Sequence, residues 1–266
     1  MAEYGKRPPR RHLIAEALAG LEALTTPAAL LSARLRPRPE LNRRPVMVLP
    51  GFGANDWSTQ PLRTYLNLSG YTTEGWGLGQ NTGGRGLVNS VSEISERWEF
   101  DRDQANPIDV EVPALCDQFF QHLQDRVQTL GSPISLIGWS LGGYIAREAA
   151  REFPDHIVQV ITLGSPIKGG PKHTTIAPLF RLRGVNLDLI EETVAERDQH
   201  PIQVPITAIS GSRDGIVSDY AARDTHSPHV RNVQVSASHI GLGLNRKVWA
   251  LILKTLEAAD RAFNAA

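Results

Sequence analysis

A serine held between closely spaced glycines is the residue of this sequence best suited to chemistry. Residues 138–143 read GWSLGG, directly after an apolar run at 134–137 and before a helix-forming stretch at 144–150. A tight turn from strand to helix leaves no room for side chains two residues either side of the serine, and Gly138 and Gly142 meet that demand. Such a turn lifts the serine above the sheet edge and aims the next backbone N–H at the same place. The pattern predicts that Ser140 is a nucleophile, with a helix-capping serine as the alternative.

A serine hydroxyl is a weak nucleophile until a base accepts its proton. Of the eight histidines, His239 alone comes just after the last predicted strand, on a loop that can return over the strand ends. Asp214 follows the preceding predicted strand and could hold the imidazole in the correct tautomer. Asp219 is its rival, and we prefer Asp214 because the acid loop should be short and Gly215 supplies its turn. The alternatives are a solvated loop histidine and turn-capping aspartates.

Alternating strands and helices must position these three side chains. The predicted strands span 46–49, 71–76, 134–139, 157–163, 205–210 and 230–236. The predicted helices span 12–35, 61–67, 113–130, 141–152 and 248–263. This alternation is typical of an α/β fold with a mostly parallel central sheet flanked by helices. We expect an N-terminal helical extension and linker at 1–45 and one catalytic domain at 46–266, with a cap or lid insertion at 167–203.

Five motifs in order carry a family resemblance. They are LPGFG at 49–53, the GWSLGG turn, LGSP at 163–166, SRDGIV at 212–217 and SHIGL at 238–242. With the chain order Ser, Asp, His, the sequence resembles the α/β-hydrolase superfamily, in its bacterial lipase/esterase-like branch of serine hydrolases. The resemblance implies the α/β-hydrolase fold with a nucleophile elbow, and a catalytic triad of Ser140, His239 and Asp214.

The resemblance also implies an oxyanion hole and an acyl pocket. The backbone N–H groups of Phe52 and Leu141 would bind the oxyanion. Lipases of this type often begin the first loop with His-Gly, whereas this chain has Pro50-Gly51, which leaves open how that loop is braced. Core packing is the alternative role for Phe52 and for the tryptophans. The expected pocket residues are apolar: Trp57, Trp76, Trp139, Ile167, Phe180, Ile216 and Ile240.

Composition limits the partners. The chain has 266 residues with 28 basic and 28 acidic side chains, so we expect no nucleic-acid partner. Cys116 is the only cysteine, which rules out an intrachain disulfide and fits a cytoplasmic location. Apolar runs are too short for a transmembrane segment, and Glu16 and Glu22 interrupt the N-terminal one, against a signal peptide. Peripheral membrane contact by the N-terminal helix stays open, as does the oligomeric state.

The expected activity is hydrolysis of a small-molecule ester or lipid through an acyl-enzyme, without metal or organic cofactor. Two alternatives remain. An acyltransferase or thioesterase would use the same triad with a different acceptor or leaving group. A non-catalytic lipid- or ester-binding protein would keep the fold without the reaction.

Overall fold

Six parallel strands form the central sheet of the computed structural model, which describes residues 7–24, 26–36 and 42–265. The strand order is β2-β1-β3-β4-β5-β6. The strands are β1 (Val46–Leu49), β2 (Thr73–Gly75), β3 (Ile134–Trp139), β4 (Ile157–Leu163), β5 (Ile206–Gly211) and β6 (Val230–Val235). This confirms the prediction of a mostly parallel sheet. All strands run the same way, so their carboxyl ends meet at one edge, where ligands bind in open α/β sheets.

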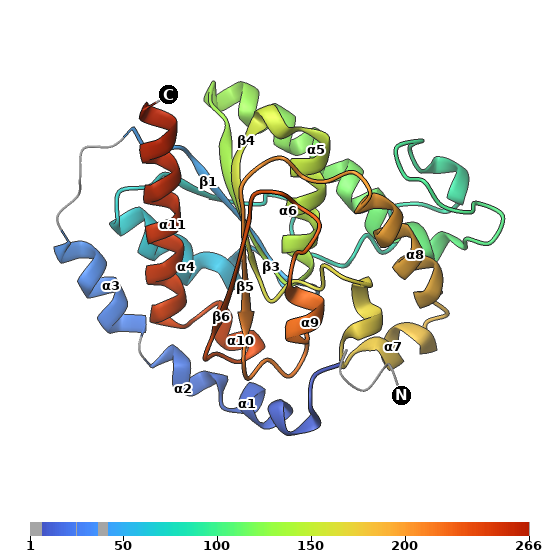
Figure 1. The fold of residues 1–266 in the computed structure, drawn as a ribbon, viewed down its shortest axis with the longest axis horizontal. Coiled ribbons are helices and arrows are strands. Elements are labelled where there is room, and N and C mark those ends of the chain that lie inside the picture. The colour runs from blue at the N-terminus through green and yellow to red at the C-terminus, as the bar shows by residue number, and fades with distance from the viewer. Residues whose placement is uncertain (1–6, 25, 37–41, 266) are drawn as a thin grey trace.

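Helices cover both faces of the sheet (Figure 1). The longer ones are α3 (Thr26–Leu35), α4 (Asp56–Leu68), α5 (Glu111–Leu130), α6 (Leu141–Glu152), α8 (Leu187–Arg197) and α11 (Arg246–Ala265). The apolar side of α11 packs Trp249, Ile252 and Leu256 into one core, together with residues of α3 and α4. On the opposite face, α5 and α6 bury Phe119, Leu123 and other apolar side chains in a second core. The sheet is thereby fixed from both sides.

Short helical segments complete the described part of the chain. They are η1 (Arg10–His12), α1 (Leu13–Ala17), α2 (Ala19–Ala23), η2 (Val91–Glu93), η3 (Pro107–Val110), η4 (Pro154–His156), η5 (Gly170–His173), α7 (Ala177–Leu182), α9 (Asp219–Ala222) and α10 (His239–Leu242). Figure 1 shows α1 and α2 running along the lower edge of the molecule, next to α10.

Two predicted helices differ from the structure. The helical stretch expected at 12–35 is divided into three short helices, with an interruption at Leu18 and a new helix that begins at Thr26, just before Pro27. The helix expected to begin at Pro61 begins at Asp56, because the Asn55 side chain caps it by accepting from Trp57 N at 3.1 Å. Part of the predicted linker, residues 37–41, lies outside the described residues.

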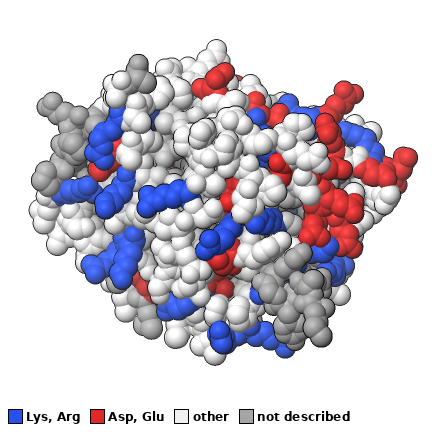
Figure 2. All heavy atoms as spheres, in the orientation of Figure 1, with Lys and Arg blue, Asp and Glu red and all other residues white. Residues whose placement is uncertain are grey.

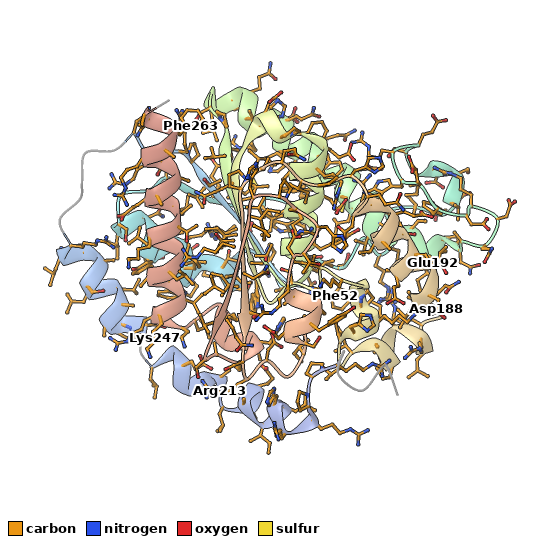
Figure 3. The ribbon with its side chains drawn as sticks, viewed as in Figure 1. Phe52, Asp188, Glu192, Arg213, Lys247 and Phe263 are labelled. Carbon is orange, nitrogen blue, oxygen red and sulfur yellow. The ribbon has the colours of Figure 1, made fainter. Side chains whose placement is uncertain are left out.

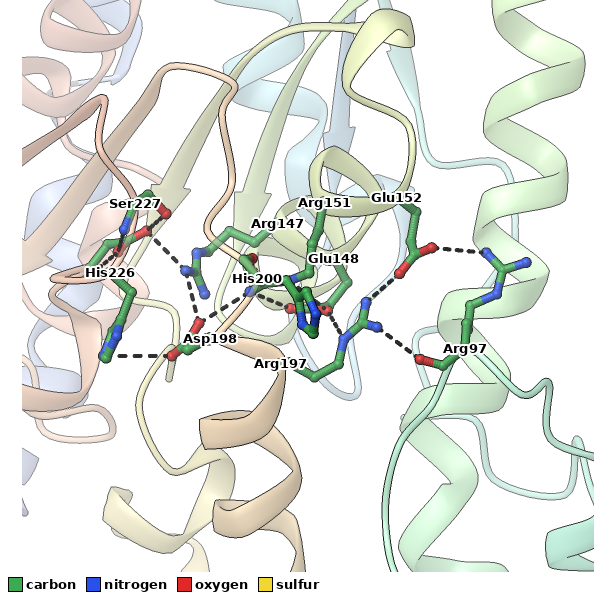
Figure 4. Close-up of polar contacts among 11 residues, drawn as sticks. Arg97, Arg147, Glu148, Arg151, Glu152, Arg197, Asp198, His200, His226 and Ser227 are labelled. Carbon is green, nitrogen blue, oxygen red and sulfur yellow. Dashed lines mark hydrogen bonds and ion pairs between the residues drawn. The ribbon is translucent and has the colours of Figure 1, made fainter.

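Buried ion pairs tie α8 to α6, the helix that follows Ser140 (Figure 4). Arg197 at the end of α8 donates to Glu148 at 2.8 Å and to Glu152 at 2.6 Å. Asp198 lies 3.1 Å from Arg151 and 3.6 Å from Arg147. Removing one partner of such a pair leaves an uncompensated charge, so these contacts fix the end of α8 firmly.

Charge is unevenly distributed on this formally neutral chain. Figure 2 shows acidic side chains gathered at the right, toward α8, and basic side chains at the left, toward α3 and α11. Within the ranges that the structure describes, no helix is both long and apolar enough to span a membrane.

Candidate active site

Ser140 lies in the sharp turn between β3 and α6. Its backbone has φ 53° and ψ −121°, the only positive φ among the described residues other than glycine. Holding a serine in this region costs roughly 1–3 kcal/mol, and such strain collects at functional sites. A hydrogen bond of 2.8 Å from Ser140 N to the Leu163 carbonyl joins the turn to the end of β4.

The glycines around Ser140 make this turn sterically feasible. A Cβ atom on Gly142 would lie 2.6 Å from the Leu49 carbonyl oxygen and 2.7 Å from that of Pro50. A Cβ atom on Gly138 would collide with the backbone of Gly142 and Gly143. The start of α6 therefore packs directly on the chain that leaves β1.

Asp214 and His239 form a buried pair. His239 Nδ1 lies 2.8 Å from Asp214 Oδ2, and the two residues are 6% and 3% exposed. The other carboxylate oxygen of Asp214 accepts from Ile216 N at 2.8 Å and Val217 N at 2.7 Å. Burial favours the neutral imidazole, but the charge and hydrogen bond of Asp214 outweigh burial and raise the pKa of His239.

Asp219, the rival acid, has different partners. Its carboxylate accepts from Ser210 Oγ at 2.6 Å and from Arg223 Nε at 2.7 Å. These contacts lower the pKa of Asp219 against the opposing effect of its burial. The structure pairs His239 with Asp214 and uses Asp219 to hold α9 against β5.

The pair and Ser140 lie at neighbouring strand ends. Ser140 follows β3, Asp214 follows β5 and His239 follows β6, while Gly164 follows β4 between them. A Cβ atom on Gly164 would lie 2.9 Å from Asp214 Oδ2 and 3.0 Å from His239 Nδ1. Glycine at this position therefore leaves space for the pair beside the turn that carries Ser140.

The loop after β1 presents a backbone donor beside Ser140. Among the described residues, neither Phe52 N nor Leu141 N donates to a backbone acceptor outside the regular helices and strands. A Cβ atom on Gly51 would lie 3.2 Å from Ser140 Cβ, which shows how closely the two loops approach. The two N–H groups are therefore available to an acceptor near Ser140.

Asn81 braces this loop, a role that the sequence did not reveal. Its side chain is fully buried and donates from Nδ2 to the Pro50 carbonyl at 2.8 Å. Its backbone carbonyl accepts from Gly53 N at 2.7 Å, and its Oδ1 accepts from Gly83 N at 3.1 Å. Asn81 thus supports the loop that begins with Pro50-Gly51 in place of His-Gly. The only sequence signal was its position in a glycine-rich loop.

An apolar cavity opens in front of Ser140. Its walls come from the loop after β1, the starts of α5 and α6, and the segment with α7 and α8. Phe52, labelled in Figure 3, packs its ring against that of Phe180 in the wall of this cavity, with 5.6 Å between the two ring centroids. The apolar lining includes Phe52, Phe100, Leu141, Tyr144, Phe180, Leu189 and Ile216.

Five of the predicted pocket residues do not line the cavity, whereas Phe180 and Ile216 do. Trp57 is 83% exposed on α4, and Ile240 is 41% exposed on α10. Trp76 and Ile167 are fully buried, and Trp76 donates Nε1 to the Gly79 carbonyl at 2.8 Å. Trp139 packs against the core that contains α11, and its Nε1 donates to the His239 carbonyl at 3.1 Å. Proximity to a strand end was therefore too coarse a criterion for pocket residues.

The sheet order, the strained serine turn and the flanking helices define the α/β-hydrolase fold, and the chain has this fold. A monoacylglycerol lipase from Paleococcus ferrophilus is 14% identical, with a TM-score of 0.55 over 81% of this chain and 94% of that one. The lipase BlEst2 from Bacillus licheniformis is also 14% identical, with a TM-score of 0.55 over 83% of this chain and 96% of that one.

Another similar structure is described with a different activity. A protein described as a non-heme bromoperoxidase, BpoC from Mycobacterium tuberculosis H37Rv, is 15% identical, with a TM-score of 0.53 over 83% of this chain and 94% of that one. No protein-family model and no curated protein matches the sequence. The similarity therefore concerns the fold, and the chemistry must be argued from the site.

Proposed function

We propose that the protein is a serine hydrolase that cleaves carboxylic esters through an acyl-enzyme. Ser140 attacks the ester carbonyl, and His239 takes the hydroxyl proton and returns it to the leaving alcohol. Asp214 holds the imidazole and stabilises the imidazolium. Water activated by His239 then releases the acid and restores Ser140.

The strained Ser140 at the mouth of an apolar cavity is the observation that carries this proposal. The hydrogen-bonded Asp214–His239 pair at the neighbouring strand ends supplies the base that the serine needs. The free N–H groups of Phe52 and Leu141 would stabilise the developing oxyanion, each by a factor of about 10²–10³ in rate.

The substrate class follows from the cavity. Its walls are largely apolar, and residues 167–203 contribute much of one side through Thr174, Ile176, Phe180 and Leu189. We assign this segment the role of a cap over the acyl chain. An acyl group of several carbons would gain about 0.8 kcal/mol for each methylene that it buries there.

Two measurements test the proposal together. The wild-type protein should hydrolyse p-nitrophenyl esters of two to ten acyl carbons, and a fluorophosphonate probe should attach to Ser140 as read by peptide mass spectrometry. Ser140→Ala should lose both activities while its thermal melt stays that of the wild type. Hydrolysis that survives in Ser140→Ala would refute the acyl-enzyme. Labelling without hydrolysis would indicate transfer to an acceptor other than water.

A further inference from the structure

The N-terminal arm, defined here as residues 10–24, crosses the two loops that carry Asp214 and His239. Figure 1 shows α1 and α2 of this arm next to α10, and Figure 3 places Arg213 at the same edge. The arm contains two carboxylates, Glu16 and Glu22, whose oxygens accept hydrogen bonds from both loops.

Glu16 joins the acid loop to the base loop directly. Its Oε1 accepts from Gly215 N at 2.7 Å and from His239 N at 2.8 Å. Its Oε2 accepts from Ile240 N at 3.0 Å. Hydrogen bonds to a charged acceptor are stronger than bonds between neutral groups. One side chain therefore sets the spacing between the residue after Asp214 and the backbone of His239.

Glu22 holds the base loop from its other side. Its Oε1 accepts from Ser238 N at 3.1 Å, and its Oε2 accepts from Asn245 Nδ2 at 2.8 Å. Arg213 NH2 lies 3.5 Å from the same carboxylate. The two acidic residues that interrupt the apolar N-terminal stretch thus both face the loops of the candidate site.

Glycines at the contact points allow the arm to approach this closely. A Cβ atom on Gly215 would lie 2.8 Å from the carbonyl carbon and oxygen of His12. A Cβ atom on Gly241 would collide with the carboxylate of Glu22. The loops and the arm are therefore sterically matched as well as hydrogen-bonded.

We infer that Glu16 is a positioning residue that sets the geometry of the Asp214–His239 pair and stabilises the imidazolium formed during the reaction. This inference rests on the proposed function, because it assigns His239 the role of base. The charge acts over a short distance, from the half-buried Glu16 to the buried His239, so solvent screens it only in part. Glu16 would thus act through His239, without contact with the substrate.

Other charged groups of both signs also lie near His239, so the effect of Glu16 on the His239 pKa must be separated from theirs. Asp214 is in direct contact, and Glu22 binds the residue before His239. Arg213 offsets part of the charge of Glu22, and His12 Nδ1 lies 3.3 Å from the Asp214 carbonyl oxygen. Burial lowers the pKa of His239, whereas Asp214 and then Glu16 raise it. Loss of the Glu16 charge should therefore lower this pKa.

The test compares Glu16→Gln and Glu16→Ala with the control Glu96→Gln, a change of the same kind at an exposed position in the loop before α5. Rates of p-nitrophenyl butyrate hydrolysis are measured from pH 5 to 9. Glu16→Ala should lower kcat by roughly tenfold to a hundredfold with little change in KM, because a small displacement of catalytic groups has this effect. Glu16→Gln keeps one acceptor oxygen, so its kcat should be higher than that of Glu16→Ala. In the pH–rate profile of Glu16→Gln, the rise on the acidic side should move to lower pH.

A second measurement does not depend on activity. A ¹⁵N-histidine NMR titration, assigned with His239→Gln, should give a lower His239 pKa in Glu16→Gln than in the wild type or in Glu96→Gln. An unchanged His239 pKa in a folded Glu16→Gln protein would overturn the inference. Loss of melting temperature and kcat with an unchanged pKa would also overturn it, because Glu16 would then only support the fold. If the wild type hydrolyses no ester, the proposed function fails, and the titration still decides whether Glu16 acts on His239.

Discussion

The side-chain amide of Asn81 donates a 2.8 Å hydrogen bond to the Pro50 carbonyl, across 31 residues of sequence. Asn81 thereby braces the loop that carries Phe52, whose N–H we propose as an oxyanion donor. Because Asn81 is fully buried, a partner lost here is not replaced by solvent, and the orphaned carbonyl costs about 1–3 kcal/mol.

We therefore predict that Asn81→Ala lowers kcat for p-nitrophenyl butyrate, up to the factor of about 10²–10³ that one oxyanion donor contributes. KM should change less than kcat, because Asn81 itself does not line the cavity. Asn89→Ala, at an exposed position in the same region, is the control. A variant in which only KM rises would mean that Asn81 supports substrate binding and not the oxyanion loop.

The choice of acid gives a second prediction. Asp214→Asn should reduce kcat by about 10⁴, because an amide favours the wrong imidazole tautomer. Asp219→Asn should stay within a few-fold of wild type, since Asp219 contacts Ser210 and Arg223 and not His239. Steady-state kinetics measure both variants, and melting curves confirm that they fold. A large loss in Asp219→Asn with a small one in Asp214→Asn would mean that the acid is misassigned.

Phe180 should determine selectivity for acyl length. Its ring packs against that of Phe52, and both rings line the cavity in which we propose that an acyl chain of several carbons lies. At about 0.8 kcal/mol for each buried methylene, losing contact with two methylenes corresponds to roughly tenfold in kcat/KM. Phe180→Ala should cause such a loss for octanoate esters and leave acetate esters nearly unchanged.

Leu182→Ala is the matched control for that prediction. Leu182 lies on the same helix, α7, but is 86% exposed and does not line the cavity. Equal losses on octanoate and acetate in Phe180→Ala would assign Phe180 to the fold. No loss on either ester would mean that the acyl chain takes another path.

The buried pair of Arg147 and Asp224 should govern acid stability. Asp224 is fully buried and lies 2.9 Å from Arg147. Burial raises the pKa of Asp224, but Arg147 and the N–H groups of Ser227 and His226 lower it further, to about 2 from 3.8. Because the folded pKa lies below the unfolded one, the stabilisation is complete above pH 3.8 and is lost as pH falls through about 2.

Asp224→Asn should therefore lower the free energy of unfolding at pH 7 by about 3–5 kcal/mol, the usual effect of breaking a buried pair. The difference between the unfolded and folded pKa values of Asp224 corresponds to roughly 2–3 kcal/mol. That part of the stability difference between wild type and variant should disappear between pH 4 and 2. Urea unfolding at several pH values measures both. Asp155→Asn, at an exposed site, should follow the wild-type curve. A pH-independent difference would assign the loss to packing or hydrogen bonding alone.

Local patterns predicted the central strands well because β1, β3 and β4 are short, buried and largely apolar. The bounds of β1, β3 and β4 and of the helix after Ser140 agree with the sequence. The Asp214–His239 contact also followed from chain order and strand ends. No comparable sequence pattern predicts the contacts of isolated polar side chains. Asn81 and Glu16 bind backbone groups, which every residue offers, so nothing in the sequence distinguishes their partners.

The arm and its partners are separated by almost the whole chain. Glu16 precedes Gly215 by 199 residues and Ile240 by 224. The arm is the first of these segments to be synthesised, and its partners are among the last. Contacts of such separation form late, because a long loop must close before they are gained. We therefore expect the sheet to assemble before the acid and base loops take their final positions, so that the site would be the last part of the molecule to mature.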